Sequence, residues 1–190
     1  MKFRLLYEGP IAPWKRGNLQ GIHAIRKDLH PQLRELWQHQ PLNINTSKWL
    51  RSPEEYAGGT IGLYETRGAT VFAPLVSKRR DLHCELEITF LRRQAPGQLI
   101  GEGGDIDNRV KTLLDALSVP PLAQQRDFQN SEGSTDPIYC LLQDDSLVIK
   151  LSVETDRLLR PTSNEHDLVA IIQVHVTASR LTFANIDIAN

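Results

Sequence analysis

The chain has 190 residues and a mass of 21.5 kDa, a length typical of one domain. Lys and Arg total 22 and Asp and Glu total 23, which gives a formal net charge of −1. This balance excludes a strongly basic nucleic-acid coat protein and a long acidic tail, although affinity for phosphate depends on where the basic residues lie. We therefore expect a single domain over residues 1–190.

Hydropathy and cysteine usage narrow the class further. The sequence contains no apolar run of about 18 residues, so we expect no membrane span. The first ten residues lack a long apolar segment and a small-residue cleavage site, so we expect no signal peptide. Cys84 and Cys140 have no CxxC neighbour, which argues against zinc binding and redox catalysis and predicts two buried thiols in a cytoplasmic protein.

The N-terminal third is predicted to hold one strand and one helix. Residues 2–8 alternate between apolar and polar side chains, which is typical of a half-buried strand, and residues 9–17 form a Pro-containing loop. The next apolar side chains follow the three-or-four spacing of one helix face: Ile22, Ile25, Leu29, Leu33, Leu36 and Trp37. Pro31 either kinks this helix or starts a second one. Residues 40–68 show no period, and we expect an irregular segment.

The rest of the chain is predicted to complete a small sheet around one more helix. Strands are expected over residues 69–76, 83–91, 146–154 and 167–177, with a turn at 78–81. A helix is expected over residues 107–117, capped by Asp105 or Asp107. Residues 118–137 are polar and form a flexible insertion. The fold class is therefore α/β (α+β), with a small mixed β-sheet packed against two or three helices.

The segment DIDNRVKTLLDAL, residues 105–117, carries the first group of candidate catalytic residues. If the chain is extended at Asp105 and Asp107, both carboxylates project from the same side. Their mutual repulsion is relieved if they share a divalent cation such as Mg²⁺, for which Mn²⁺ can substitute. Lys111 and Asp115 follow at four-residue intervals on the same helix flank, where Lys111 can contact a phosphate.

The segment QDDSLVI, residues 143–149, carries the second group. Asp144 and Asp145 occupy a turn before a strand, from which a carboxylate could meet the first pair. Simpler interpretations remain open at this point. Asp105 or Asp107 can be a helix cap, residues 107, 111 and 115 can form a solvated ion-pair ladder, and Asp144 and Asp145 can serve the turn.

Taken together, the two segments resemble the RusA-type Holliday-junction resolvases, and the order of predicted elements is similar as well. The resemblance implies metal-binding carboxylates at Asp105, Asp107 and Asp145, with Asp144 as the alternative third ligand, and a catalytic lysine at Lys111. Asp115 matches a helix-ending aspartate of lesser, structural importance. The family similarity implies a homodimeric, Mg²⁺-dependent endonuclease that cuts branched DNA in recombination and repair. Competing hypotheses are a nuclease acting on other DNA structures and a non-catalytic DNA-binding or assembly protein.

Binding of DNA requires cationic groups that offset the backbone phosphates. The candidates lie in short basic groups near the predicted loops and the motif helix: Lys15, Arg16, Lys78, Arg79, Arg80, Arg92, Arg93 and Arg109. Each basic group taken alone is more often part of a solvated surface than of a binding site. His23 and His30, on the first helix, are expected at the surface and outside the catalytic machinery.

Overall fold

The computed structural model describes residues 1–12, 19–56, 59–93, 106–122, 136–164, 166–182 and 185–189. The fold is mixed α+β, as the sequence predicts. Its largest sheet has four strands in the order β1-β9-β6-β8: β1 (Lys2–Pro10), β6 (Leu82–Arg92), β8 (Val148–Arg157) and β9 (Asp167–Ala178). β9 is antiparallel to both β1 and β6, whereas β8 is parallel to β6.

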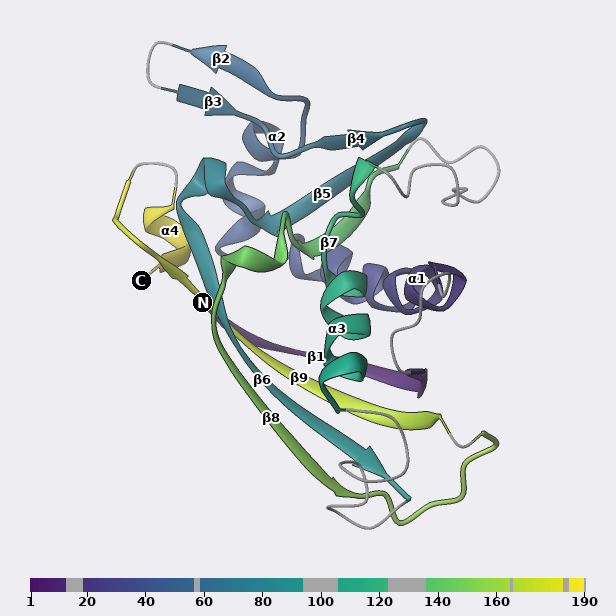
Figure 1. The fold of residues 1–190 in the computed structure, drawn as a ribbon. Helices are drawn as coiled ribbons and strands as arrows, with labels where there is room; N and C mark the ends of the chain where they lie inside the picture. Colours follow the sequence, from purple (N-terminus) through teal and green to yellow (C-terminus); the bar gives the residue numbers. More distant parts are fainter. Residues whose placement is uncertain are drawn as a thin grey trace.

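The four-stranded sheet forms because its strands alternate apolar and polar side chains. In β6 every second side chain from Leu82 to Arg92 is buried, and β9 shows a similar alternation over most of its length. Helices α1 (Leu19–Leu36) and α3 (Ile106–Leu117) lie on one side of this sheet (Figure 1). The opposite side carries polar and charged residues, as expected for a sheet with one face in water.

Helix α1 buries the face that its spacing predicts. Ile22, Ile25, Leu29 and Leu33 are all at most 2% exposed and belong to the main hydrophobic cluster. Pro31 lies inside α1, so the alternative that Pro31 starts a second helix is wrong. The helix also caps the free edge of β1, because the Gln32 side chain accepts from Leu6 N and donates to Leu6 O.

Two smaller sheets lie beyond α1. One has the order β4-β5-β7 and comprises β4 (Glu65–Arg67), β5 (Thr70–Val76) and β7 (Ile138–Leu142), with β5 and β7 parallel. The other pairs β2 (Glu54–Tyr56) with β3 (Gly59–Ile61). Tyr139 of β7 joins this layer to α1, since its amide donates to His30 Nδ1 over 2.9 Å.

The expectation of an irregular segment at 40–68 is wrong. This region holds a 3-10 turn at Leu42–Asn45 and the short helix α2 (Thr46–Trp49), followed by β2, β3 and β4. Each of these elements has only three or four residues, which is too short for a periodic pattern to show. Strand β7 and the short C-terminal helix α4 (Ile186–Ala189) also lie outside the predicted elements. Residues 123–135 of the predicted insertion at 118–137 lie outside the described residues.

A buried guanidinium connects the two main helices. Arg26 of α1 is 1% exposed and donates to the carbonyl oxygens of Asp115 and Ser118, at the C-terminal end of α3. These carbonyls carry the negative end of the α3 dipole, so the charge of Arg26 is offset where it is buried. Burial nevertheless lowers the pKa of Arg26, while nearby Cys140 and Asp115 oppose that shift.

No described helix is long and apolar enough to cross a membrane. The prediction of two buried thiols is confirmed, because Cys84 and Cys140 are free and at most 1% exposed. Burial raises the pKa of Cys84 to about 12 and that of Cys140 to about 11, so both thiols are protonated at neutral pH and are poor nucleophiles.

We predict that Arg26→Met lowers the free energy of unfolding by about 2–4 kcal/mol, because two buried carbonyls lose a charged donor. Arg34→Met is the matched control on the same helix. The Arg34 side chain is 56% exposed and contacts Asp136 at 3.6 Å, and removal of such a surface pair costs less than about 1 kcal/mol. Urea denaturation followed by circular dichroism measures both variants, and equal losses would contradict the capping role of Arg26.

Candidate active site

Helix α3 presents two different faces to its surroundings. Val110, Leu113, Ala116 and Leu117 are buried against the core. Asp107 and Lys111, one turn apart on the flank beside this apolar stripe, are both exposed. Residues at this spacing are neighbours on a helix surface, and an anionic ligand bound at Asp107 through a cation would therefore meet Lys111.

The N-terminal half of α3 is fixed by contacts to the segment after β1. Arg109 is fully buried and donates through Nη1 to Ile11 O. Thr112 Oγ1 donates to Ala12 O over 3.1 Å. With the Arg26 contacts at its other end, α3 is held along its whole length, so the directions of Asp107 and Lys111 are determined by the core.

Asp107 itself lies in the first turn of α3, and its Oδ1 accepts from the Asn108 amide over 2.9 Å. The helix begins at Ile106, so Asp107 is inside the helix and does not occupy the capping position. Asp105, the other predicted cap, lies outside the described residues. A carboxylate in the first turn is stabilised by the positive end of the helix dipole.

The QDDS segment forms a turn between β7 and β8. Asp144 caps the 3-10 turn Asp145–Leu147 by accepting from the Ser146 amide over 3.0 Å. Hydrogen bonding from the side chain and from the amide of Ser146 lowers the pKa of Asp144, with a smaller contribution from Lys78. Asp144 therefore serves the turn, as the simpler interpretation predicts, and Asp145 beside it is likewise exposed.

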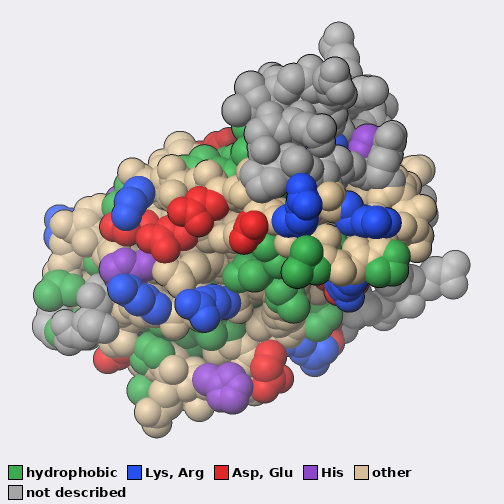
Figure 2. All heavy atoms as spheres, turned by 90° about the horizontal axis from the view of Figure 1, so that it is seen from below, with side chains coloured by type: hydrophobic (Ala, Val, Ile, Leu, Met, Phe, Trp, Pro, Cys, Tyr) green, Lys and Arg blue, Asp and Glu red, His purple; other side chains and the backbone are tan. Residues whose placement is uncertain are grey.

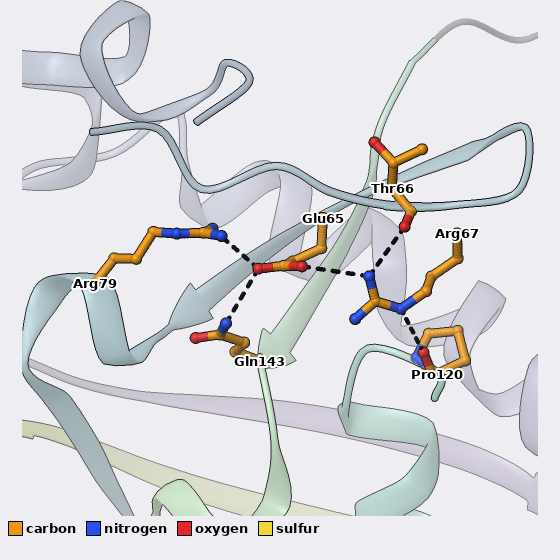
Figure 3. Close-up of polar contacts among 6 residues, drawn as sticks. All are labelled: Glu65, Thr66, Arg67, Arg79, Pro120 and Gln143. Atoms are coloured by element: carbon orange, nitrogen blue, oxygen red, sulfur yellow. Dashed lines mark hydrogen bonds and ion pairs between the residues drawn. The ribbon is translucent and has the colours of Figure 1, made fainter. Parts of the chain in front are cut away.

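A polar network that sequence reasoning missed holds this turn in place (Figure 3). Glu65 of β4 contacts Arg79 at 2.9 Å and Arg67 at 3.3 Å, and it accepts from Gln143 over 3.1 Å. Gln143 also accepts from the amide of Lys78 through Oε1. The Glu65 side chain is only 13% exposed, so its charge is offset by two guanidinium groups. Because Glu65 and Gln143 are far apart in sequence, no local pattern could have indicated the pair.

Asp107 does not come together with Asp144 and Asp145. Val148, three residues after Asp145, pairs with Cys84 of β6, and Cys84 pairs with Val176 of β9. The Asp145 turn therefore lies near the C-terminal end of β9. The first half of α3 contacts Ile11 and Ala12, beyond the pairing of Pro10 with Asp167 at the other end of β9. Figure 1 shows the start of α3 well away from the segment between β7 and β8. Asp107 and Asp145 thus lie at opposite ends of the sheet, and the expectation that they share one metal ion within a chain is not met.

The described residues contain no group of three His, Cys, Asp or Glu side chains that could hold a metal ion. This statement does not extend to Asp105, which lies outside the described residues. What remains of the predicted metal site is the pair Asp105 and Asp107, with Lys111 one turn further along α3.

Three of the predicted DNA contacts are wrong because the side chains are buried. Arg80 and Arg92 are both 3% exposed, and Arg109 is fully buried. Arg80 stacks on Trp49, with its guanidinium carbon 4.3 Å from the ring centroid. Burial lowers the pKa of Arg80 to about 9, so even this guanidinium is protonated at neutral pH. These arginines belong to the protein interior.

The remaining basic candidates differ in their accessibility. Lys78 and Arg93 are exposed, and Arg79 is partly exposed but paired with Glu65. Lys15 and Arg16 lie outside the described residues. The expectation of a surface position is wrong for His23, which is 6% exposed and lies against Arg26. His30 is half-buried and accepts from Tyr139 N.

The outer face of the four-stranded sheet is not a basic surface. Glu85 and Glu87 of β6 contact Lys150 at 3.8 and 3.9 Å, and Glu87 accepts from Gln173. Figure 2 shows acidic and basic side chains interspersed on this side of the molecule. A face with paired charges gives little net attraction for phosphate, so the face does not supply the cationic surface that DNA binding requires.

Comparison with known proteins assigns no family and no function to the chain. No protein-family model matches the chain, and neither the curated proteins nor the solved structures contain a significant match.

We predict that Asp144→Ala destabilises the protein by about 0.5–1 kcal/mol at pH 7, because the capping acceptor is lost. The folded-state pKa of Asp144 is lowered below 3.8, so the charge contributes stability above pH 3.8 and this contribution disappears as the pH falls through the lowered pKa. The difference between wild type and Asp144→Ala should therefore shrink progressively in denaturation curves recorded at pH values falling below 3.8. Asp145→Ala is the matched control, and an equal, pH-dependent loss in that variant would contradict the cap.

Proposed function

We propose that the protein is a Mg²⁺-dependent endodeoxyribonuclease that cuts branched DNA, such as Holliday junctions, in cytoplasmic recombination and repair. The observation that carries the proposal is the exposed flank of α3, where Asp107 and Lys111 stand one turn apart on a helix held by buried contacts at both ends. Its support from the sequence is the resemblance of residues 105–117 and 143–149 to RusA-type resolvases.

The chemistry of the donors fits a cation at the start of α3. Mg²⁺ takes one or two carboxylates and completes its shell with water and phosphate oxygens, so Asp105 and Asp107 would suffice as protein ligands. When bound there, Mg²⁺ would activate a water and neutralise charge on the scissile phosphate. Asp145 does not fit the same site within one chain, because it lies at the other end of the sheet.

The protein's own residues supply the remaining functions in this proposal. Lys111 neutralises charge on the phosphate from the position one helical turn beyond Asp107. The N-terminus of α3 adds its positive dipole at the same place. Arg109 and Thr112 act as positioning residues, because their bonds to Ile11 O and Ala12 O keep this end of α3 in place. Exposed Arg93 remains a candidate phosphate contact, because it follows the end of β6 that pairs with the start of β9. Exposed Lys78 lies beside the Asp144 turn at the other end of the sheet and is not part of this site.

A second candidate function is a non-catalytic DNA-binding or assembly protein that keeps this fold. The separation of Asp145 from Asp107 favours it, because a three-carboxylate metal site is not assembled in the described chain. The exposed positions of Asp107 and Lys111 favour the nuclease, so turnover on DNA decides between the two.

We predict that purified protein cleaves a synthetic four-way junction in the presence of Mg²⁺, and that Asp107→Asn slows cleavage by about 10²-fold or more through loss of a charged ligand. Asp28→Asn removes an exposed carboxylate from α1 and should leave the rate unchanged. Asp145→Asn should have the smaller effect of the two motif variants. Cleavage is followed on denaturing gels with labelled strands under single-turnover conditions.

The same assay separates the alternatives. Junction binding without metal-dependent cleavage would favour the assembly protein, whereas equal cleavage of forks, flaps and duplex would favour a nuclease without junction preference. Equal rates for wild type and Asp107→Asn would eliminate the proposed metal site.

A further inference from the structure

Strand β8 presents a long open edge. Among the described strands it pairs only with β6, whereas the opposite edge strand of the same sheet, β1, has its backbone bonded by Gln32. In the described part of the chain no side chain of another element bonds the backbone of β8. Figure 1 shows β8 as the outermost strand on its side of the sheet. An edge of ten residues is a template for pairing with another strand.

The side chains of β8 are more exposed than those of a strand that is covered. Ile149 is 58% exposed and Leu151 is 43% exposed. A bulge between Cys84 and Glu85 changes the register, so that Leu151 and Val153 lie beside Leu86 and Ile88 on the core side of the sheet. Leu151 therefore belongs to the apolar face, yet it is left uncovered at the rim.

The sequence of β8 is complementary to itself when two copies of the strand run antiparallel. If Ser152 of one copy lies opposite Ser152 of the other, Lys150 faces Glu154 of the second copy and Leu151 faces its Val153. Both charged pairs lie on the outer side of the sheet, and both apolar pairs lie on the core side. Opposite charges and apolar pairs directly across two strands stabilise the pairing.

Other registers lose one of these matches. Centring on Leu151 places Lys150 opposite Ser152, and centring on Val153 places Leu151 opposite Thr155. A lysine on an edge strand discourages pairing with unrelated strands. Lys150 contacts Glu85 and Glu87 of its own chain at 3.8 and 3.9 Å, and in this register Glu154 of the second copy would face it from across the edge. The composition of β8 thus favours one partner and one register.

We propose that two copies of this chain join through their β8 edges, antiparallel and centred on Ser152, to form one continuous sheet of eight strands. The contact is isologous, as two-fold symmetric dimers require, and it uses the main-chain pairing of strand addition. The resemblance to RusA-type resolvases already implies a homodimer, and the inference adds the surface and the register through which the two copies join.

The first test is the oligomeric state of the full chain, without DNA or metal, by analytical ultracentrifugation over a range of protein concentrations. Wild type should sediment as a dimer, and Lys150→Glu should shift it to monomer because like charges then face each other. The double variant Lys150→Glu/Glu154→Lys should restore the dimer. Lys78→Glu is the control, because it removes an exposed lysine away from β8. A monomeric wild type, or a dimer that Lys150→Glu leaves intact, would overturn the proposal.

The second test reports the register and does not depend on destabilising the dimer. Facing Cα atoms in an antiparallel pair are about 4.5–5.5 Å apart, which suits a disulfide, so Ser152→Cys should give a cross-linked dimer on oxidation. Ser163→Cys, an exposed serine outside β8, should stay monomeric on the non-reducing gel. Absence of the Ser152→Cys cross-link in a folded dimer would place the interface elsewhere. Because both tests omit DNA, their failure is distinct from failure of the nuclease assay.

Discussion

The rest of the structure depends on how Arg26 caps helix α3. Its guanidinium, 1% exposed, donates to the carbonyls of Asp115 and Ser118, where α3 ends and the chain turns toward the β7 layer. Leaving those carbonyls unpaired in the interior would cost more than the hydrogen bonds contribute. With Arg109 and Thr112 bonded to the segment after β1, the helix is tied to β1 at one end and to α1 at the other. Asp107 and Lys111 face solvent because the opposite flank of α3 packs against the core.

The distribution of arginines separates structure from candidate function. Among the described residues the guanidinium groups of Arg26, Arg80, Arg92 and Arg109 are buried, so these four are not available to contact phosphate. The outer sheet face has paired charges, with Lys150 between Glu85 and Glu87. A near-neutral chain of this kind suits recognition of a shaped substrate better than coating of any duplex. In the proposed function, the phosphate binds where α3 begins, beside exposed Asp107 and Lys111.

Periodicity predicts the long elements and part of the site, and it also indicates which side chains of these elements are buried. Alternation in β6 and the three-or-four spacing of α3 gave both elements and the exposed flank of Asp107 and Lys111. The same patterns place Arg92 on the buried side of β6 and Arg109 in line with Leu113 and Ala116, so their burial was predictable. The stacking of Arg80 on Trp49 and the position of Asp145 were not, because they depend on contacts between distant segments. Strand β7, five buried residues without alternation, left no strand signal.

The core holds Asp107 and Asp145 at opposite ends of the sheet, and this separation can be measured. Spin labels on Asp107→Cys and Asp145→Cys, diluted with unlabelled protein, test it by pulsed dipolar spectroscopy, since buried Cys84 and Cys140 will not react in the folded state. From the strand rise along β9, the account predicts a distance distribution centred above about 20 Å. A main peak below about 15 Å, too short for labels at opposite ends of such a strand, would show that the two carboxylates converge and would contradict it.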